Sequence, residues 1–197
     1  MSIVFQFFAV FLTAAFVENM IFTRSLGASW ILYLVKNPKN LFHYMALLSG
    51  VSLASAAIGY PLRGLLERRE DAYILIPMAM IGVVVVVYVA SNFLLKKCLP
   101  DTFEAIRKRM STAVFNGVVF GGLLVPSIER LDFVGTLAYS LGTSFGFAVA
   151  VLLVGFGIER IGLCHVPKAF RGLPVVLIYL GLLSLAFYGL VGHQLPT

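Results

Sequence analysis

Charged side chains are scarce in this sequence: Asp, Glu, Lys and Arg together make up 12% of its 197 residues. Soluble domains carry about 25% of these residues and roughly 45–50% apolar ones, whereas 60% of the residues here are hydrophobic. A soluble core of this size could not bury that much apolar surface. The composition therefore excludes an ordinary soluble domain and indicates a chain whose solvent is lipid.

Cysteine is also scarce, with only Cys98 and Cys164 in the chain. The two show no CxxC spacing, and no cluster of His, Asp or Glu lies near either in the sequence. This pattern excludes a disulfide framework and a recognisable metal site, so we expect two free, inert thiols. The first residues also lack the basic stretch and the cleavage site of a signal peptide. We expect the first apolar run to be retained as a membrane span.

The sequence contains several long apolar segments. A bilayer core about 30 Å thick needs roughly 20 apolar residues in a helix. Six stretches reach or nearly reach this length, namely residues 3–22, 44–66, 72–95, 110–128, 133–158 and 174–191. Residues 25–35 are uncharged but too short to cross alone, so they form either a re-entrant piece or the second half of a broken first span. We predict an all-α membrane protein of six transmembrane helices.

The distribution of basic residues predicts the orientation. With both termini extracytoplasmic, 11 of the 15 Lys and Arg residues fall on the cytoplasmic side, and the remaining four are Arg63, Arg68, Arg69 and Arg130. The positive-inside rule favours this arrangement. The formal charge of +6 then belongs to loops at the membrane surface. We therefore expect membrane lipid, and no nucleic acid, as a partner.

The chain divides into two similar halves. Residues 1–97 and 98–197 each hold three predicted spans, and each half has polar and small residues near its first span. They are Glu18-Asn19 with Leu26-Gly27-Ala28-Ser29 in the first half, and Phe115-Asn116-Gly117 with Gly121-Gly122 in the second. A repeated three-span unit inserts upside down relative to its copy, because three is odd. This predicts two inverted three-helix repeats in which the first helix of each is broken and the two breaks can meet near the midplane.

Three residues are candidates for an ion path or midplane site. Glu18 is the only acidic residue in the first apolar run, and ionisable residues inside a membrane are candidate ion or proton sites. Alternatively, Glu18 lies near the end of its span and pairs with Arg24 or reaches headgroup water. Asn19 and Asn116 either flank a site between the broken helices or cap the half-helices. The sequence leaves these alternatives open.

Several segments carry a resemblance to a known family. They are Glu18-Asn19 and residues 24–27 in the first half, and residues 142–147 (GTSFGF), 159–161 (ERI), 166–172 (VPKAFRG) and 183–187 (LSLAF) in the second. With these segments the chain resembles the RnfA/NqrE family over essentially its whole length, most specifically across residues 139–190. The resemblance implies six spans in two inverted repeats.

The resemblance also implies a function. RnfA/NqrE proteins are subunits of redox-driven ion pumps in the bacterial inner membrane, of the Rnf (ferredoxin:NAD) or Nqr (NADH:quinone) kind. Each pairs with a homologue of opposite topology, RnfE- or NqrD-like. The pair holds a two-iron two-sulfur cluster, to which each subunit gives one cysteine from each repeat. We therefore expect a homologous subunit or a second copy as partner, with other redox subunits alongside.

The chain departs from the family at these cysteines. The family's Leu-Gly-x-Cys-Pro reads here as Leu26-Gly27-Ala28-Ser29-Trp30, and its Thr-Asn-Cys reads as Phe115-Asn116-Gly117. The ligand positions thus become Ser29 and Gly117, although iron–sulfur clusters are held by thiolates. We predict a noncatalytic subunit of an electron-transport and ion-translocating complex that binds no metal or cofactor. Iron–sulfur, flavin or NAD(H) would belong to partner subunits.

Two other interpretations remain. Inverted repeats with broken helices are typical of secondary transporters, so the chain could be a small transporter or channel no longer coupled to electron transfer. This interpretation rests on analogy between folds. In the other, a partner supplies all the ligands of a retained cluster.

Overall fold

The computed structural model describes residues 3–36, 41–98 and 103–191, and every regular element within these ranges is a helix. The all-α prediction is therefore confirmed. Four stretches are long and apolar enough to cross a membrane, namely Leu41–Leu66, Ala72–Lys97, Met110–Ile128 and Phe133–Gly162. They correspond to the second to fifth predicted spans. The first and last predicted spans contain shorter apolar helices, Ile3–Val17 and Leu173–Gly189.

The first predicted span is not one continuous helix. Residues 3–22 contain α1 (Ile3–Leu12), the π-helix η1 (Thr13–Val17) and the start of α2 (Met20–Arg24), and α3 (Ala28–Lys36) follows them. The first break falls at Glu18 and Asn19, where the sequence places its polar pair. The second break follows α2, where Ser25 and Gly27 adopt left-handed φ angles of 56° and 85°. The stretch predicted as a re-entrant piece or second half-span is thus largely the separate helix α3.

The fourth predicted span is interrupted as well. It consists of α6 (Phe103–Val114) and α7 (Gly117–Ile128), with Phe115 and Asn116 between them. The helical region begins at Phe103, seven residues before the predicted start at 110. The prediction missed this part because its charged side chains lower the local hydropathy. At such an interruption, the backbone N–H and C=O groups of the helix ends lack hydrogen-bond partners unless another group caps them. The side chain of Asn116 supplies one of those partners.

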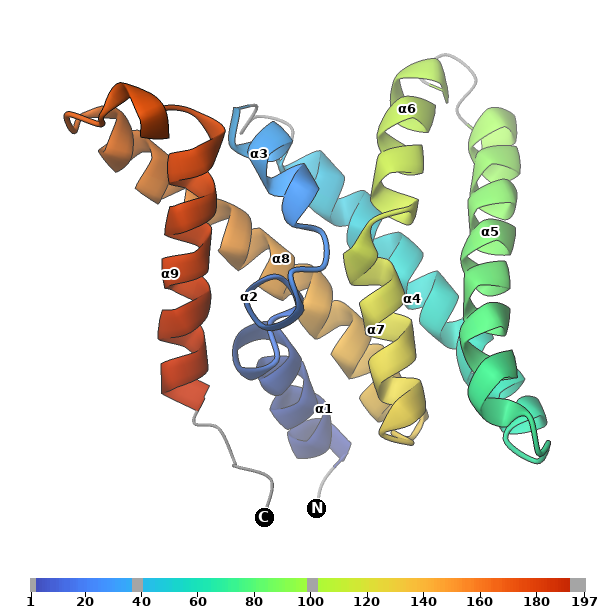
Figure 1. The fold of residues 1–197 in the computed structure, drawn as a ribbon. Coiled ribbons are helices and arrows are strands. Elements are labelled where there is room, and N and C mark those ends of the chain that lie inside the picture. The colour runs from blue at the N-terminus through green and yellow to red at the C-terminus, as the bar shows by residue number, and fades with distance from the viewer. Residues whose placement is uncertain (1–2, 37–40, 99–102, 192–197) are drawn as a thin grey trace.

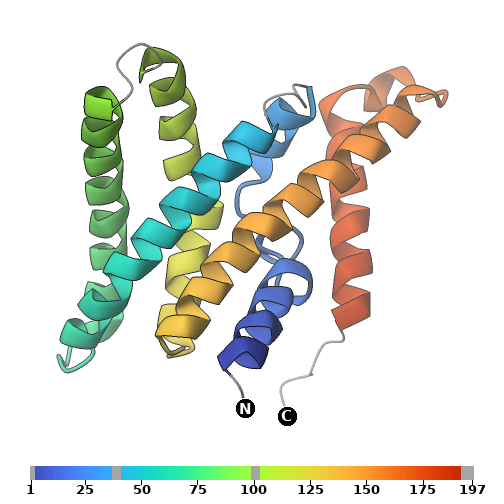
Figure 2. The same ribbon diagram turned by 180° about the vertical axis from the view of Figure 1, so that it is seen from behind.

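Two long helices form the centre of the molecule. α4 (Leu41–Leu66) and α8 (Phe133–Gly162) slope across it side by side (Figure 2). Small residues let their backbones approach, and the buried hydroxyls of Ser52 and Ser144 lie 3.2 Å apart between them. Hydroxyl hydrogen bonds of this kind link helices where water is absent.

The flanks of the molecule are formed by α5 (Ala72–Cys98) and α9 (Leu173–Val191), which lie at opposite sides (Figure 1). α9 packs on α2, where the rings of Phe22 and Phe187 stack 4.3 Å apart, and on α8. The outward faces of both flanking helices remain apolar and exposed, as at Val86, Phe93 and Leu185. A surface of this kind is suited to contact with lipid or with another membrane subunit.

Arg63 fixes one end of the helical layer. The residue is 8% exposed on α4, and its guanidinium donates hydrogen bonds to the backbone carbonyls of Pro126 (3.1 Å) and Leu131 (3.0 Å). It also lies 2.9 Å from the carboxylate of Glu67. These contacts tie the turn between α7 and α8 to α4.

Candidate functional site

The two helix interruptions meet inside the molecule. A Cβ atom added to Gly27 would lie 2.5 Å from Oδ1 of Asn116, and one added to Gly117 would lie 3.1 Å from the backbone N of Gly27. The break after α2 therefore touches the start of α7. Position 27 favours glycine for two reasons: its φ of 85° is left-handed, and the close contact with Asn116 leaves no room for a side chain.

Asn19 closes the first interruption. The side chain is fully buried, and its Oδ1 accepts a 3.1 Å hydrogen bond from the backbone N of Ile21, which caps α2. Its Nδ2 donates to the carbonyls of Ala15 and Gly146, each at 2.9 Å. One amide thus satisfies backbone groups on both sides of the break and fastens them to α8.

Asn116 does the same for the second interruption. It too is fully buried, and its Oδ1 accepts a 3.1 Å hydrogen bond from the backbone N of Val118, which caps α7. Its Nδ2 donates to the Tyr44 hydroxyl at 2.9 Å, and that hydroxyl donates to the carbonyl of Thr112 at 3.2 Å. The capping interpretation of both asparagines is confirmed, while a part in an ion site stays a prediction.

Glu18 lies beside α8, away from the ends of that helix. Its neighbour Asn19 bonds to Gly146, thirteen residues into α8 and so about 20 Å from the start of that helix. The half-buried Glu18 carboxylate accepts a 2.7 Å hydrogen bond from the hydroxyl of Tyr139. Its hydrogen-bond partner is thus this hydroxyl, and not Arg24.

A second carboxylate belongs to the same electrostatic group. Glu129 follows the last residue of α7. The Glu129 side chain is exposed, but partial desolvation by neighbouring atoms, and then the negative charge of Glu18, raise the pKa of its carboxyl, while the guanidinium of Arg24 acts to lower it. Glu18, Arg24, Glu129 and Tyr139 are thus electrostatically coupled, with a direct hydrogen bond between Glu18 and Tyr139, and we call the four residues the Glu18 cluster. The sequence analysis missed Tyr139 and Glu129, because no local pattern connects residues that only tertiary packing brings together.

The comparisons with known proteins identify the family of this chain. The family described as "Rnf-Nqr subunit, membrane protein" matches residues 7–193. The chain belongs to the Rnf-Nqr family. It is 26% identical to a subunit of the Na(+)-translocating ferredoxin:NAD(+) oxidoreductase complex of Acetobacterium woodii, over 94% of this chain and 97% of that one.

Other Rnf-Nqr relatives are similar over comparable lengths. A subunit of the Na(+)-translocating NADH-quinone reductase of Photorhabdus laumondii is 25% identical over 96% of this chain and 99% of its own. A subunit of the ion-translocating oxidoreductase complex of an Azoarcus strain is 29% identical over 95% and 97%. The resemblance found in the sequence is confirmed over the whole length.

The two residues that the sequence analysis expects at the ligand positions, Ser29 and Gly117, lie at the two interruptions. Gly117 is the first residue of α7, and Ser29 lies in the first turn of α3, with its side chain outside the described part of the structure. The exposed Cys164 is a free thiol just beyond α8, and Cys98 ends α5 with an undescribed side chain. Among the described residues, no three His, Cys, Asp or Glu side chains gather closely enough to hold a metal ion.

Proposed function

We propose that this chain is a membrane subunit of an Rnf- or Nqr-type electron-transport and ion-translocating complex, and that it holds no iron–sulfur cluster of its own. One observation carries the proposal: the chain is similar to such subunits over nearly its whole length, but it has Ser29 and Gly117 where the family resemblance places cysteine ligands. A neutral hydroxyl is a poor iron ligand beside a thiolate, and glycine offers no ligand at all.

The packing around Gly117 also fits a cluster poorly. A Cβ atom there would already lie 3.1 Å from the backbone N of Gly27 and 3.4 Å from Cβ of Leu26. The helix interruptions therefore pack directly on one another, and backbone fills the space into which a ligand side chain would point. The subunit's contribution is then helix packing, with iron–sulfur, flavin or NAD(H) chemistry supplied by partner subunits.

We propose six spans in two inverted three-helix repeats, residues 1–97 and 98–197. The first interrupted segment and the α6–α7 pair each carry a buried capping asparagine, as two copies of one unit would. The start of α1 and the end of α9 lie at the same end of the molecule (Figure 1), as an even number of crossings requires. With the positive-inside rule, this supports a multi-pass protein of the bacterial inner membrane with both termini extracytoplasmic.

The same repeats suggest where an ion path would run. Glu18 presents a carboxylate at the first interruption, and Asn19 and Asn116 cap the helices that follow the two interruptions. Ionisable residues inside spans face bundle interiors or water-filled paths when they have a function. The partner across the exposed apolar flanks would be a homologous subunit of opposite topology, or a second copy.

Iron analysis of the isolated polypeptide tests the proposal. The chain is purified in mild detergent, together with whatever subunits accompany it, and then alone. We expect flavoprotein or ferredoxin-like subunits by mass spectrometry in the first preparation. In the second, we expect iron and sulfide below one atom per chain. Stoichiometric iron and sulfide on the lone chain would overturn the absence of a cluster.

Reconstitution separates this proposal from the transporter alternative. The lone chain is placed in liposomes with no electron donor present, and ion uptake is measured. We expect no uptake above that of empty vesicles. Uptake by the lone chain would favour a transporter or channel that is no longer coupled to electron transfer.

A further inference from the structure

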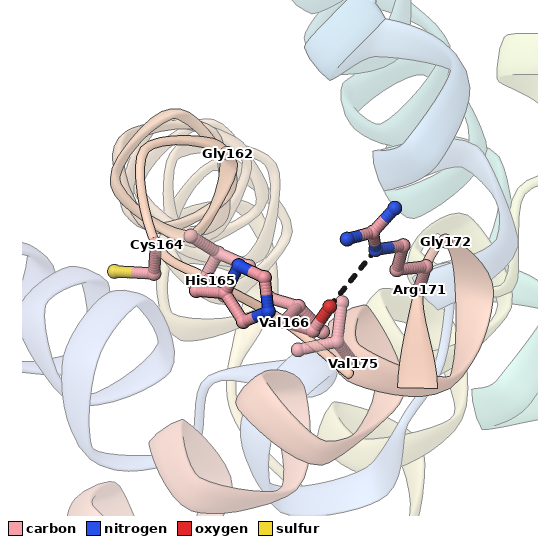
Figure 3. Close-up of a pocket in the computed structure, with 8 residues that line it drawn as sticks. Gly162, Cys164, His165, Val166, Arg171, Gly172 and Val175 are labelled. Carbon is pink, nitrogen blue, oxygen red and sulfur yellow. Dashed lines mark hydrogen bonds between the residues drawn. The ribbon is translucent and has the colours of Figure 1, made fainter. Parts of the chain in front are cut away.

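The connection between α8 and α9 forms a pocket with polar walls. The pocket has a volume of about 320 Å³, and its polar side chains include His165 and Arg171 (Figure 3). Arg171 is held in place because its Nε donates a 2.8 Å hydrogen bond to the carbonyl of Val166. The two terminal nitrogens of the guanidinium point away from that carbonyl (Figure 3). They are thus placed to bind an anion.

An apolar groove continues from this pocket. A second cavity of about 340 Å³ shares Gly162 and Val175 with the polar pocket and continues over Val35 and Val176. A third cavity, of about 360 Å³, shares Val35 with the second and runs between α3, α4 and α8. The three cavities adjoin one another through these shared lining residues along a path with a polar end at the α8–α9 loop and mainly apolar cavities along the helices. We call this path the lipid groove.

The charge around the polar end is positive. Arg160, Lys168 and Arg171 lie on or beside the α8–α9 connection, with Glu159 as the neighbouring acid. Glu159 lines the third cavity and neither the polar pocket nor the second cavity. A ligand with a negative head at Arg171 and an apolar tail along the second cavity therefore matches this end of the path.

We infer that the lipid groove binds an anionic phospholipid. Its phosphate would lie against Arg171 and His165, and one acyl chain would lie along Gly162, Val176 and Val35. Basic pockets between membrane helices on the positively charged face bind anionic headgroups in this manner. A free phosphate ion would use only the polar end, and a neutral lipid would leave Arg171 without a counter-charge. The inference does not depend on the proposed function.

Lipid titration of the full chain tests the polar end. The chain in detergent is titrated with phosphatidylglycerol and with phosphatidylcholine of the same acyl chains, and bound lipid is counted by native mass spectrometry. We expect tighter binding of phosphatidylglycerol. Arg171→Gln should weaken it about five-fold, which corresponds to about 1 kcal/mol for one basic side chain.

Lys168→Gln is the matched control, because Lys168 is exposed on the same loop but does not line the pocket. It should leave the affinity unchanged. Equal affinity for the two lipids would overturn the inference. Equal losses in both variants would also overturn it, because they would indicate a diffuse positive surface.

Substitutions at two glycines test the apolar part of the lipid groove. Gly162 lines both the polar pocket and the second cavity, and no atom lies within 4 Å of a Cβ added there, so Gly162→Leu should fill the groove without a clash. Gly181→Leu on α9 also meets open space but lies outside the groove. We expect Gly162→Leu alone to reduce phosphatidylglycerol binding at least five-fold, with equal helix content in both variants. Unchanged binding in Gly162→Leu, or competition by inorganic phosphate at equal concentration, would assign the pocket to a free anion instead.

Discussion

The hydroxyl of Tyr139 on α8 donates a 2.7 Å hydrogen bond to the carboxylate of Glu18 at the first helix interruption. The bond joins residues 121 positions apart in the sequence. Because Asn19 next to it bonds to Gly146, two successive side chains fasten the break to the same helix. The Glu18 carboxylate is thereby held inside the helix bundle in a fixed orientation.

If Glu18 lies on an ion path, removing its charge should reduce transport without unfolding the protein. Glu18→Gln keeps an acceptor for the Tyr139 hydroxyl but has no charge, so the fold should hold. We expect donor-driven ion uptake by the reconstituted complex to fall about tenfold or more, the size of one interaction of about 1.4 kcal/mol. Tyr139→Phe keeps the charge and removes only the orienting bond, so its effect should be smaller.

Glu104→Gln provides the control for this pair, because the Glu104 side chain is 86% exposed on α6. It should leave ion uptake unchanged. Full ion uptake by the Glu18→Gln variant would show that Glu18 is not part of the ion path, whatever the result for Tyr139→Phe.

The two capping asparagines should differ in their tolerance of Asp. At position 19 the amide nitrogen donates to two backbone carbonyls, neither of which can donate in return. Asn19→Asp would place a carboxylate against two carbonyl oxygens and should destabilise the fold by about 2–3 kcal/mol. At position 116 the amide nitrogen donates to the Tyr44 hydroxyl, which can turn its proton toward a carboxylate. Asn116→Asp should therefore cost less.

Thermal unfolding in detergent measures this difference. We expect the midpoint of Asn19→Asp to lie well below that of Asn116→Asp, with the wild type highest. The reverse order would contradict the hydrogen-bond directions described for the two caps.

The sequence predicted the helix breaks and that the two can meet, but not which residues are in contact. Glu18-Asn19 and Asn116 stand out because polar residues interrupt apolar runs, and the chain does break at both places. By contrast, the approach of Gly27 to Gly117 depends on how separate helices pack, and neither residue carries a signal of its partner. Hydropathy likewise found α4, α5 and α8 but missed the start of α6, where charged residues form a helix outside the apolar run.

The close approach of α1 and α8 should make two glycines sensitive to alanine. A Cβ added to Gly142 would lie 2.5 Å from the carbonyl O of Phe11, and one added to Gly146 would lie 2.7 Å from that of Ala15. Backbone cannot yield as a flexible side chain does, so each substitution should destabilise the fold by about 1–3 kcal/mol. Gly50→Ala on α4 meets no atom within 4 Å and should be neutral or stabilising by about 0.5–1 kcal/mol. Equal midpoints in all three variants would contradict the packing of α1 on α8.

Glu129 should make the folded protein less stable as the pH rises. Its pKa is raised in the folded protein, so the folded state binds the proton more tightly than the unfolded state does. Stability should therefore fall as the pH rises through the interval between the ordinary pKa of 4.5 and the raised value. Glu129→Gln removes this titration, so the midpoint of thermal unfolding should fall less than that of the wild type as the pH rises above the ordinary pKa of 4.5.

Two further variants identify the cause of the Glu129 shift. Glu18→Gln removes a charge that raises the pKa of Glu129, so the loss of stability with rising pH should be weaker than in the wild type. Arg24→Gln removes the charge that lowers it, so the loss should be steeper. Identical pH profiles in both variants would mean that the Glu18 cluster is not electrostatically coupled, and desolvation alone would then shift the pKa of Glu129.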